Sequence, residues 1–293
     1  MRNTIYTLLI VLLAVVNVQA QEEDKTTSEI ESEVVVGAIG GTVDVSTLGG
    51  AVYTIPIQVP EGINGMQPNL SIVYNSQSGN GLLGWGWNLG GISAITRVGH
   101  SIYHDNYIDG VDFDNDAFAL DGQRLMVVNG LSDGANGAEY RTEIDNFSKV
   151  MSYTQTINQG GGLFGHGSYE MLNNFRVWTS DGLILDYGNT QDSRITYSNG
   201  SIDEVALWLL NRVEDRNGNA MTYHYNREGN CYYLSSIEYT SNETANLYPI
   251  YKIEFLYSNR EDIERSYIGN HEVTQTNLLN CIKIVNVEEA GID

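Results

Sequence analysis

The sequence predicts an all-β protein made of antiparallel sheets and hairpins. Helical periodicity is scarce, whereas alternation of apolar with polar or small residues recurs along the chain. Tyrosine outnumbers phenylalanine by 19 to 6, which suits half-buried strands whose side-chain tips reach water. The strictest alternation lies at residues 83–90. Its two sets are Leu83, Trp85, Trp87 and Leu89, and Gly84, Gly86, Asn88 and Gly90.

Residues 83–90 are therefore expected to form one strand. Successive side chains of a strand point to opposite faces, so one face would carry both indoles and the other would be nearly bare backbone. We expect Trp85 and Trp87 to be buried, with Gly84 and Gly86 letting a neighbouring segment approach closely. A glycine-rich loop around two buried tryptophans is the alternative, but loops rarely keep period two over eight residues.

The residues before this segment predict two more strands. One face of 53–59 is apolar, and Pro56 at its centre cannot donate to a ladder, which favours an edge strand. The next apolar face is Leu70, Ile72 and Tyr74. Turn signals at 60–62 and 64–65 separate the two strands, and 75–81 is a turn-rich connection.

Short strands bounded by turn signals continue along the chain. Ser180-Asp181-Gly182 predicts a hairpin between 175–178 and 183–185. The other expected strands are 34–39, 42–45, 92–98, 124–128, 234–239, 253–257 and 278–287, and 160–162 is an expected exposed loop.

The region 201–225 allows two interpretations. Ser201 and Glu204 before an apolar run fit a helix capping box. Asn217-Gly218-Asn219, between 212–215 and 221–225, instead predicts strand, tight turn and strand, because Asn-Gly is a strong hairpin signal. We therefore expect strand from Leu209 onward.

The first 36 residues have the composition of an export signal and a spacer. Residues 1–20 combine Arg2, an apolar core at 8–16 and a small-residue cleavage site ending at Ala20, as in a secretory signal peptide. That core is too short to span a bilayer. Residues 21–36 are acidic and expected to be disordered. We therefore expect an exported protein, secreted or held in the periplasm or at the cell surface, with no membrane span.

The formal net charge of −22 restricts the partners. Loss of Arg2 with a signal peptide would make the charge one unit more negative. A surface of this sign opposes binding to nucleic acid and to anionic membranes.

Several blocks in a fixed order resemble a known family. They are Ile55-Pro56-Ile57, Val59-Pro60, 65–71, 74–76, 79–87, 118–125, 139–147, Asp181-Gly182, Tyr187-Gly188 and 212–219. Together they resemble the N-terminal region shared by SpvB virulence proteins, toxin-complex B subunits and related RHS/YD-repeat proteins. The resemblance covers about residues 37–287. It divides the chain into an SpvB-like β region at 37–200 and a hairpin region at 201–293.

The hairpin region resembles one divergent YD repeat. Asn219 follows Gly218, Tyr223 and Tyr225 give the Tyr-x-Tyr pattern, and Asn226 stands where the repeat usually has Asp. In the family such hairpins wind into a hollow shell, and a single repeat cannot close one because repeats bury their faces against neighbours. The resemblance thus implies an incomplete portion of an RHS/YD-type shell, and the chain would be truncated relative to its relatives.

By this resemblance the function is structural and the protein is not an enzyme. The module would help to build a shell around a toxic C-terminal domain that this chain lacks, and its partners would be the other parts of that assembly. No catalytic residue, metal ligand or cofactor is expected. The residues expected to matter are structural: Trp85, Trp87, Gly84, Gly86, Pro56, Pro68, Asp121, Gly122, Asp215, Gly218 and Asn219.

A surface module that binds glycans or proteins is the alternative function. Abundant Tyr, Trp and Asn would allow it, and it would need aromatic side chains that line an open groove. An ADP-ribosylating enzyme is a third class. The acidic run at Glu29, Glu31 and Glu33 superficially fits its motif, but a solvated tail is the simpler interpretation.

Two groups of residues resemble metal sites. Asp112, Asp114 and Asp116 have the spacing of an EF-hand start, but Ala117 and Gln123 stand where that loop needs Gly and Glu. Alternating acids on the wet face of a strand explain the same pattern. His100 and His104 are four residues apart, which on a helix would suit a metal, but we expect strand and loop there and scattered surface histidines.

Cys231 and Cys281 are the only cysteines. An exported protein can oxidise such a pair, and two separately buried thiols are equally consistent with the sequence.

Overall fold

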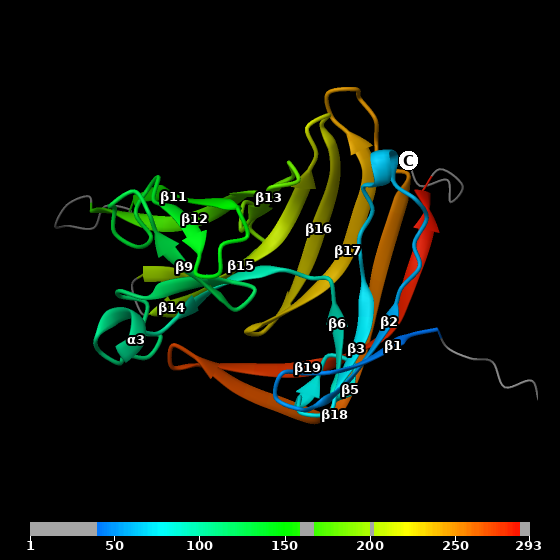
Figure 1. The fold of residues 1–293 in the computed structure, drawn as a ribbon, viewed down its shortest axis with the longest axis horizontal. Coiled ribbons are helices and arrows are strands. Elements are labelled where there is room, and N and C mark those ends of the chain that lie inside the picture. Colours follow the sequence, from blue (N-terminus) through cyan, green and yellow to red (C-terminus); the bar gives the residue numbers. More distant parts are fainter. Residues whose placement is uncertain (1–39, 159–166, 200–201, 288–293) are drawn as a thin grey trace, which may run out of the picture. The chain divides into compact units, whose positions relative to one another are not determined.

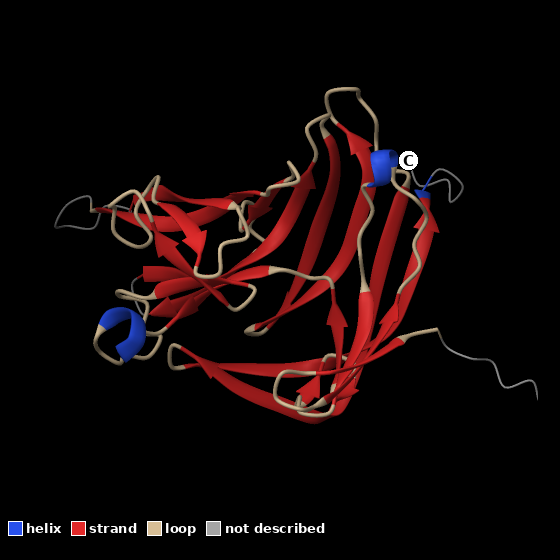
Figure 2. Ribbon diagram, in the orientation of Figure 1, coloured by secondary structure: helices blue, strands red, loops and turns tan. Residues whose placement is uncertain are grey.

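The computed structural model describes residues 40–158, 167–199 and 202–287. This part of the chain is almost entirely strand and loop, which confirms the predicted all-β class (Figure 2). The chain divides into two units, residues 1–40 and 41–293, and the described residues after Gly40 belong to the second. The expected signal peptide, the acidic spacer, the strand at 34–39 and the loop at 160–162 lie outside the described residues.

A four-stranded antiparallel sheet comes first, with the order β1-β2-β3-β6. Its strands are β1 Thr42–Val45, β2 Ala51–Pro56, β3 Ser71–Asn75 and β6 Trp87–Gly90. A one-turn helix, η1 Ile63–Gly65, lies between β2 and β3. A two-residue pair, β4 Asn80–Gly81 and β5 Gly84–Trp85, precedes β6.

Most of the remaining residues form one antiparallel sheet of thirteen strands (Figure 1). Its hydrogen-bonded path is β13-β12-β11-β10-β9-β8-β7-β15-β16-β17-β18-β19, with β14 attached to β15. The strands are β7 Ala94–Val98, β8 Ala117–Leu120, β9 Gln123–Val127, β10 Glu139–Thr142, β11 Lys149–Asn158, β12 Ser168–Trp178, β13 Ile184–Tyr187, β14 Arg194–Asn199, β15 Ile202–Glu214, β16 Asn219–Glu228, β17 Cys231–Asn242, β18 Tyr251–Ile268 and β19 His271–Asn286.

Two parts of this sheet differ in connectivity. Because β13 also pairs with β15, strands β7 to β13 and β15 close into a ring. Beyond β15 the sheet is an open series of long hairpins, β16 to β19, which Figure 1 shows side by side. The last of them, β19, is 16 residues long and pairs along one side with β18.

The hydrophobic core of the ring is a cluster of aromatic side chains. Phe118, Tyr140, Phe175 and Trp208 come from β8, β10, β12 and β15 and are all buried. Ring centroids of Phe175 and Trp208 lie 5.0 Å apart and those of Phe118 and Trp208 5.5 Å apart, each nearly perpendicular. Edge-to-face pairs of this kind stabilise a core beyond their buried area.

The structure corrects the predicted strand at 83–90. Gly84 and Gly86 have φ of +107° and +79°, so the chain turns twice where we expected one straight strand. Trp85 is consequently 71% exposed, and its predicted burial is wrong. Trp87 is half-buried, with its ring centroid 5.1 Å from that of Tyr74. A Cβ on Gly86 would lie 2.6 Å from the Tyr74 ring, so the expected close approach holds there, whereas Gly84 has open space around it.

The prediction that Pro56 marks an edge strand is also wrong. Strand β2 lies between β1 and β3. Strand β1 pairs only with residues 51–54, so Pro56 lies past its end and needs to donate no ladder hydrogen bond on that side.

The helix alternative at 201–225 is excluded, because Glu204 lies inside strand β15. The predicted hairpin is confirmed, with Glu214 opposite Ala220 across the turn. The hairpin predicted around Asp181 is also confirmed, since Trp178 pairs with Ile184.

Candidate functional site

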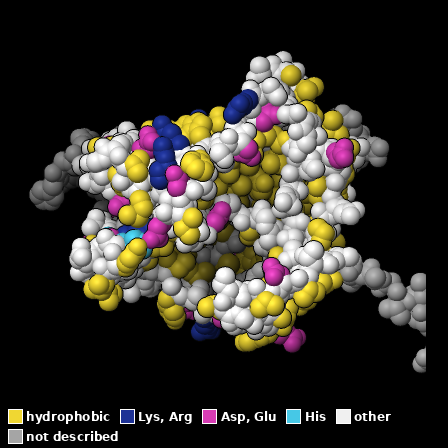
Figure 3. Space-filling model, in the orientation of Figure 1, with side chains coloured by type: hydrophobic (Ala, Val, Ile, Leu, Met, Phe, Trp, Pro, Cys, Tyr) yellow, Lys and Arg dark blue, Asp and Glu magenta, His cyan; other side chains and the backbone are white. Residues whose placement is uncertain are grey.

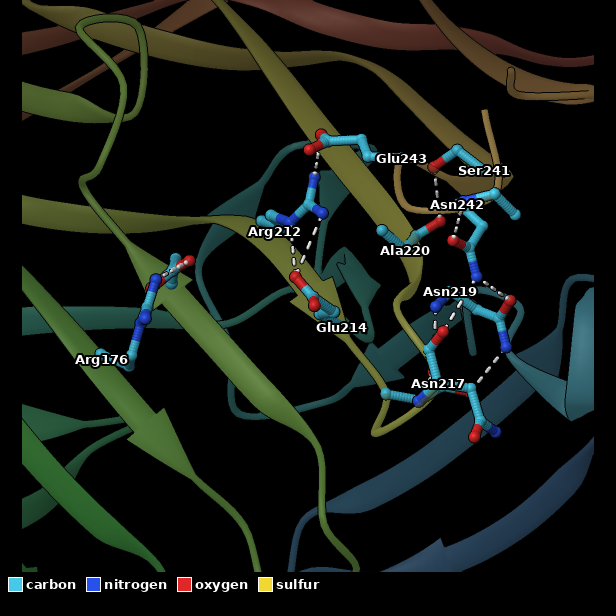
Figure 4. A network of polar contacts seen from close by, with 12 residues as sticks. Arg176, Arg212, Glu214, Asn217, Asn219, Ala220, Ser241, Asn242 and Glu243 are labelled. Carbon is cyan, nitrogen blue, oxygen red and sulfur yellow. Dashed lines mark hydrogen bonds and ion pairs between the residues drawn. The ribbon is translucent and has the colours of Figure 1, made fainter. Parts of the chain in front are cut away.

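The turn between β15 and β16 is held by a network of polar contacts (Figure 4). Gly218 adopts φ +83°, and Asp215 N donates to Asn219 O at 3.0 Å, as in a three-residue hairpin loop with glycine in the left-handed region. The Asp215 carboxylate accepts hydrogen bonds from Asn217 N, Asn219 N and Asn219 Nδ2 at 2.8–2.9 Å. A fourth comes from Asn64 Nδ2 in η1 at 3.2 Å.

The same turn is tied to the next hairpin. Asn242 Nδ2, at the end of β17, donates to Asn217 O and to Asn219 Oδ1, both at 3.0 Å. Ser241 Oγ donates to Ala220 O at 3.1 Å (Figure 4). These bonds satisfy buried polar groups at the end of two strands, and they join η1, β15, β16 and β17.

The carboxylate of Asp215 has a lowered pKa. Burial raises it, but the hydrogen bonds from Asn219, Asn64 and Asn217 stabilise the charged form and prevail. This stabilising contribution is present above the unfolded-state pKa, and it is lost as pH falls through the folded-state pKa.

Two arginines make ion pairs in this sheet, Arg212 with its own strand β15 and with the loop after β17, and Arg176 across β12 and β13 (Figure 4). Arg212 contacts Glu214 at 3.1 Å and Glu243 at 2.9 Å. Arg176 on β12 makes a bidentate pair with Asp186 on β13, at 2.6 and 2.9 Å. Bidentate pairs fix geometry as well as charge, so they hold the register of the strands they join.

Asp121 and Gly122 form the two-residue turn between β8 and β9. Both have positive φ, +49° and +80°, which a type I′ turn requires. Ser93 Oγ donates to the Asp121 carboxylate at 2.7 Å and contacts the Tyr187 hydroxyl at 2.8 Å. The turn is thereby joined to β13.

The candidate calcium residues instead organise a loop before β8. Asp116 is buried, and its carboxylate accepts from Asp112 N at 3.1 Å and Phe113 N at 2.9 Å and pairs with Arg97 at 3.2 Å. These residues precede the strand, so the wet strand face expected for them is wrong. Within the described ranges, no three His, Cys, Asp or Glu side chains are placed to share a metal ion.

Arg97 joins that loop to the aromatic core. Its guanidinium carbon lies 5.2 Å from the ring centroid of Phe113, 5.7 Å from that of Phe118 and 5.6 Å from that of Trp208. Its Nε donates to Val205 O at 2.7 Å. A buried cation with aromatic and carboxylate partners is favourable because each partner replaces lost hydration.

A cleft of about 920 Å³ opens beside Arg97. Its lining includes Phe113, Phe118 and Tyr169. Burial raises the pKa of Asp133 and of Glu204, and Glu204 Oε2 is buried without a hydrogen-bond partner. The carboxylates that line the cleft are Asp114, Asp116, Asp133, Glu170, Asp203 and Glu204.

The histidine prediction needs correction. A short helix, α3 Ile102–Asp105, lies where we expected strand and loop. The side chains of His100 and His104 are only 10% and 18% exposed, so they are not scattered surface residues. His100 Nδ1 lies 3.2 Å from Asp105 Oδ1, and His104 Nε2 lies 3.1 Å from Glu143 Oε1.

Both cysteines are free thiols, Cys231 partly buried and Cys281 exposed. The disulfide alternative is therefore wrong, and so is the expected burial of Cys281. Among the described residues, no helix is long and apolar enough to cross a membrane.

Comparison with known proteins decides the family. A family model described as SpvB, the Salmonella virulence plasmid 65kDa B protein, matches residues 45–282. The chain belongs to the SpvB family. A search of curated proteins gave no match.

Solved structures share the fold. The N-terminal domain of the effector protein SpvB from Salmonella typhimurium strain LT2 is 18% identical, with a TM-score of 0.60 over 81% of this chain and 89% of that one. The TcdB2-TccC3 crystal structure is 18% identical, with a TM-score of 0.66 over 87% of this chain. The Photorhabdus luminescens Tc holotoxin pore with TccC3-D651A is 17% identical, with a TM-score of 0.62 over 89%. The chain spans only 14% of each of these two toxin chains.

Sequence reasoning identified the turn residues of the site but missed its core. Asp215, Gly218, Asn219, Asp121 and Gly122 all stand in the turns just described. Pro68 is buried. Trp208 and Arg97 were missed, although an arginine in the alternating segment 94–98 and a tryptophan in an apolar run were available signals.

Proposed function

We propose that this chain is a non-enzymatic wall segment of a larger exported, toxin-type assembly. The supporting observation is the open end of the thirteen-stranded sheet. Strand β19 is 16 residues long and pairs along one side with β18. On its other side Leu279 N donates to Leu82 O at 2.9 Å, and no further strand of the described residues pairs there. Unpaired strand edges of this length attract further strands, so the wall is extended there by strands of the same assembly.

The partners in this proposal are the remaining wall and a toxic C-terminal domain that the completed wall encloses. Family membership and the fold shared with SpvB and TcdB2-TccC3 support it. The polar contacts at the β15–β16 turn fit this role, because they join this hairpin to the end of β17. The proposed wall segment carries a signal peptide at residues 1–20 and a spacer at 21–36, and its two β regions meet at residue 200. The signal peptide directs the protein out of the cytoplasm.

Photo-cross-linking in the producing cell tests the proposal. A photoreactive residue replaces Asn280, which is exposed on β19, and a matched control replaces the exposed Tyr248 in the β17–β18 loop. We expect the Asn280 probe to capture strand segments with YD-type sequence, and the control to capture none. Equal capture at both positions, or no capture at Asn280, contradicts a wall that continues from β19.

The surface-binding alternative has one observation in its favour, the exposed indole of Trp85. Trp85 does not line the 920 Å³ cleft, whose aromatic side chains are Phe113, Phe118 and Tyr169. A glycan array with the purified chain distinguishes the two functions. Binding that a Trp85→Ala variant loses would support the alternative over the wall.

A further inference from the structure

Helix α3 has its polar side inward and its apolar side outward. The side chains of His104 and Asp105 are 18% and 16% exposed, whereas Ile102 and Tyr103 are 61% and 83% exposed. Helices on globular proteins normally turn their apolar side chains to the core. The polar residues here anchor the turn, with Asp105 Oδ1 2.7 Å from Arg124 Nη2.

The loop after β10 also presents apolar side chains to solvent. Ile144 is 72% exposed and Phe147 is 81% exposed. Phe147 has φ +62°, a conformation that non-glycine residues adopt at a cost of about 1–3 kcal/mol. Asp145 Oδ1 holds it there by accepting from Phe147 N at 2.8 Å. A strained backbone that fixes a phenyl ring in water points to a function for that ring.

One contact joins the two segments. His104 Nε2 of α3 lies 3.1 Å from Glu143 Oε1, next to Ile144, and the ring of Tyr103 stands edge-on to that of His104 at 4.7 Å. Figure 3 shows hydrophobic side chains beside the histidine at the place of α3. We call this surface the α3 patch. It consists of Ile102, Tyr103, Tyr107, Ile108, Ile144 and Phe147.

Single exposed apolar residues need no explanation, but a gathered set marks an interaction surface. Tyrosine and phenylalanine are also side chains that dominate the binding energy of interfaces. The α3 patch therefore has the composition of a binding surface, on a part of the chain that is remote in the sheet order from the open edge at β19.

Charge selects the kind of partner. The exposed carboxylates of Asp109, Glu143 and Asp145 lie beside these apolar side chains in sequence, and the neighbouring cation Arg124 is already paired with the inward Asp105. The whole chain carries −22. A second copy of this chain and an anionic bilayer are both repelled at such a surface.

We propose that the α3 patch docks a protein segment whose apolar side chains are flanked by lysine or arginine. The apolar side chains of the partner cover Tyr103, Ile108 and Phe147, and its cations face the carboxylates of the rim. This proposal does not depend on the wall function.

Hydrogen-exchange mass spectrometry of the purified chain tests it with three designed helical peptides. One carries leucine at helical spacing (i, i+3, i+4, i+7) and lysine at the other positions, the second replaces its leucines with serine, and the third replaces its lysines with glutamate. We expect the leucine-lysine peptide to protect residues 99–109 and 142–149. The serine-lysine and leucine-glutamate peptides leave both segments unprotected, because the first lacks the apolar side chains and the second lacks the cations.

Matched variants show whether binding depends on the α3 patch or on the negative charge of the whole surface. Tyr103→Ser and Ile108→Ser are expected to weaken binding at least about tenfold, while Tyr248→Ser and Leu48→Ser, which are exposed to the same degree, leave it unchanged. Equal weakening by all four variants, or protection elsewhere on the chain, overturns the proposal. So do patch-dependent binding to phosphatidylcholine vesicles and patch-dependent dimerisation in analytical ultracentrifugation, which would make the occupant a lipid surface or a second copy.

Discussion

The indoles at positions 208, 87 and 85, one in each of the three sheets, form a graded test of how the strands are packed. Trp208 is fully buried, Trp87 is half-buried, and Trp85 is 71% exposed. A buried tryptophan removes about 200 Å² from water, worth roughly 5 kcal/mol at about 25 cal/mol per Å². Trp208 Nε1 also donates to Asn173 O at 3.1 Å, a bond worth about 1 kcal/mol. Because the unfolded chain already covers part of that area, the expected loss is lower than the sum.

We therefore expect Trp208→Ala to lower the free energy of unfolding by about 3–5 kcal/mol. The expected losses are about 1–2 kcal/mol for Trp87→Ala and less than about 0.5 kcal/mol for Trp85→Ala. Urea unfolding followed by far-UV circular dichroism measures all three, since the readout does not depend on the indoles. If Trp208→Ala does not fold, Trp208→Phe supplies the same ranking with a smaller loss. Equal losses at positions 208 and 85 would refute the packing described here.

Three further predictions concern the polar contacts. Arg97→Met should cost about 3 kcal/mol because it leaves Asp116 buried and unpaired, and an accompanying Asp116→Asn should restore part of it in a urea double-mutant cycle; additive losses would refute the coupling. Asp215→Asn should abolish part of the stability loss on acidification below about pH 5, since the lowered pKa of Asp215 makes its contribution disappear as pH falls through that pKa; identical pH profiles would exclude that role. Gly218→Ala should cost about 1–2 kcal/mol in thermal unfolding because of its φ of +83°, with Gly218→Asn costing less; a neutral Ala variant would show that the turn relaxes.

Local signals in the sequence predicted the hairpins well. Ser180-Asp181-Gly182 and Asn217-Gly218-Asn219 specify their turns because only a few residue types tolerate positive φ, which Gly182 and Gly218 adopt. The tolerance of glycine for positive φ is also the reason why the strand predicted at 83–90 was wrong. Alternate glycines there fit a bare strand face, but Gly84 and Gly86 instead turn the backbone, and sequence alone cannot distinguish a missing side chain from a required positive φ.

The core could not be predicted because it depends on distant pairings. Strand β7 pairs with β15 across more than 100 residues, and this pairing is what brings Arg97 to Trp208 and Val205. The run around Trp208 is apolar on both faces, so it lacks the alternation that identifies a half-buried strand. The loop carboxylate Asp116 looked like one of several surface acids, since its burial follows from the position of Arg97.

Amide hydrogen exchange along β19 tests the wall proposal most directly. In an edge strand, alternate N–H groups point away from the strand it pairs with. For the isolated chain we predict that amides bonded to β18 exchange slowly and that the alternate amides without an acceptor exchange fast. Leu279 N, which donates to Leu82 O, and the amides of Thr276 and Asn277, which donate to the Tyr233 hydroxyl, are not counted among them. In the assembly recovered from the producing cell, both sets should be slow. Fast exchange of the alternate amides in both samples would contradict a wall that continues from β19.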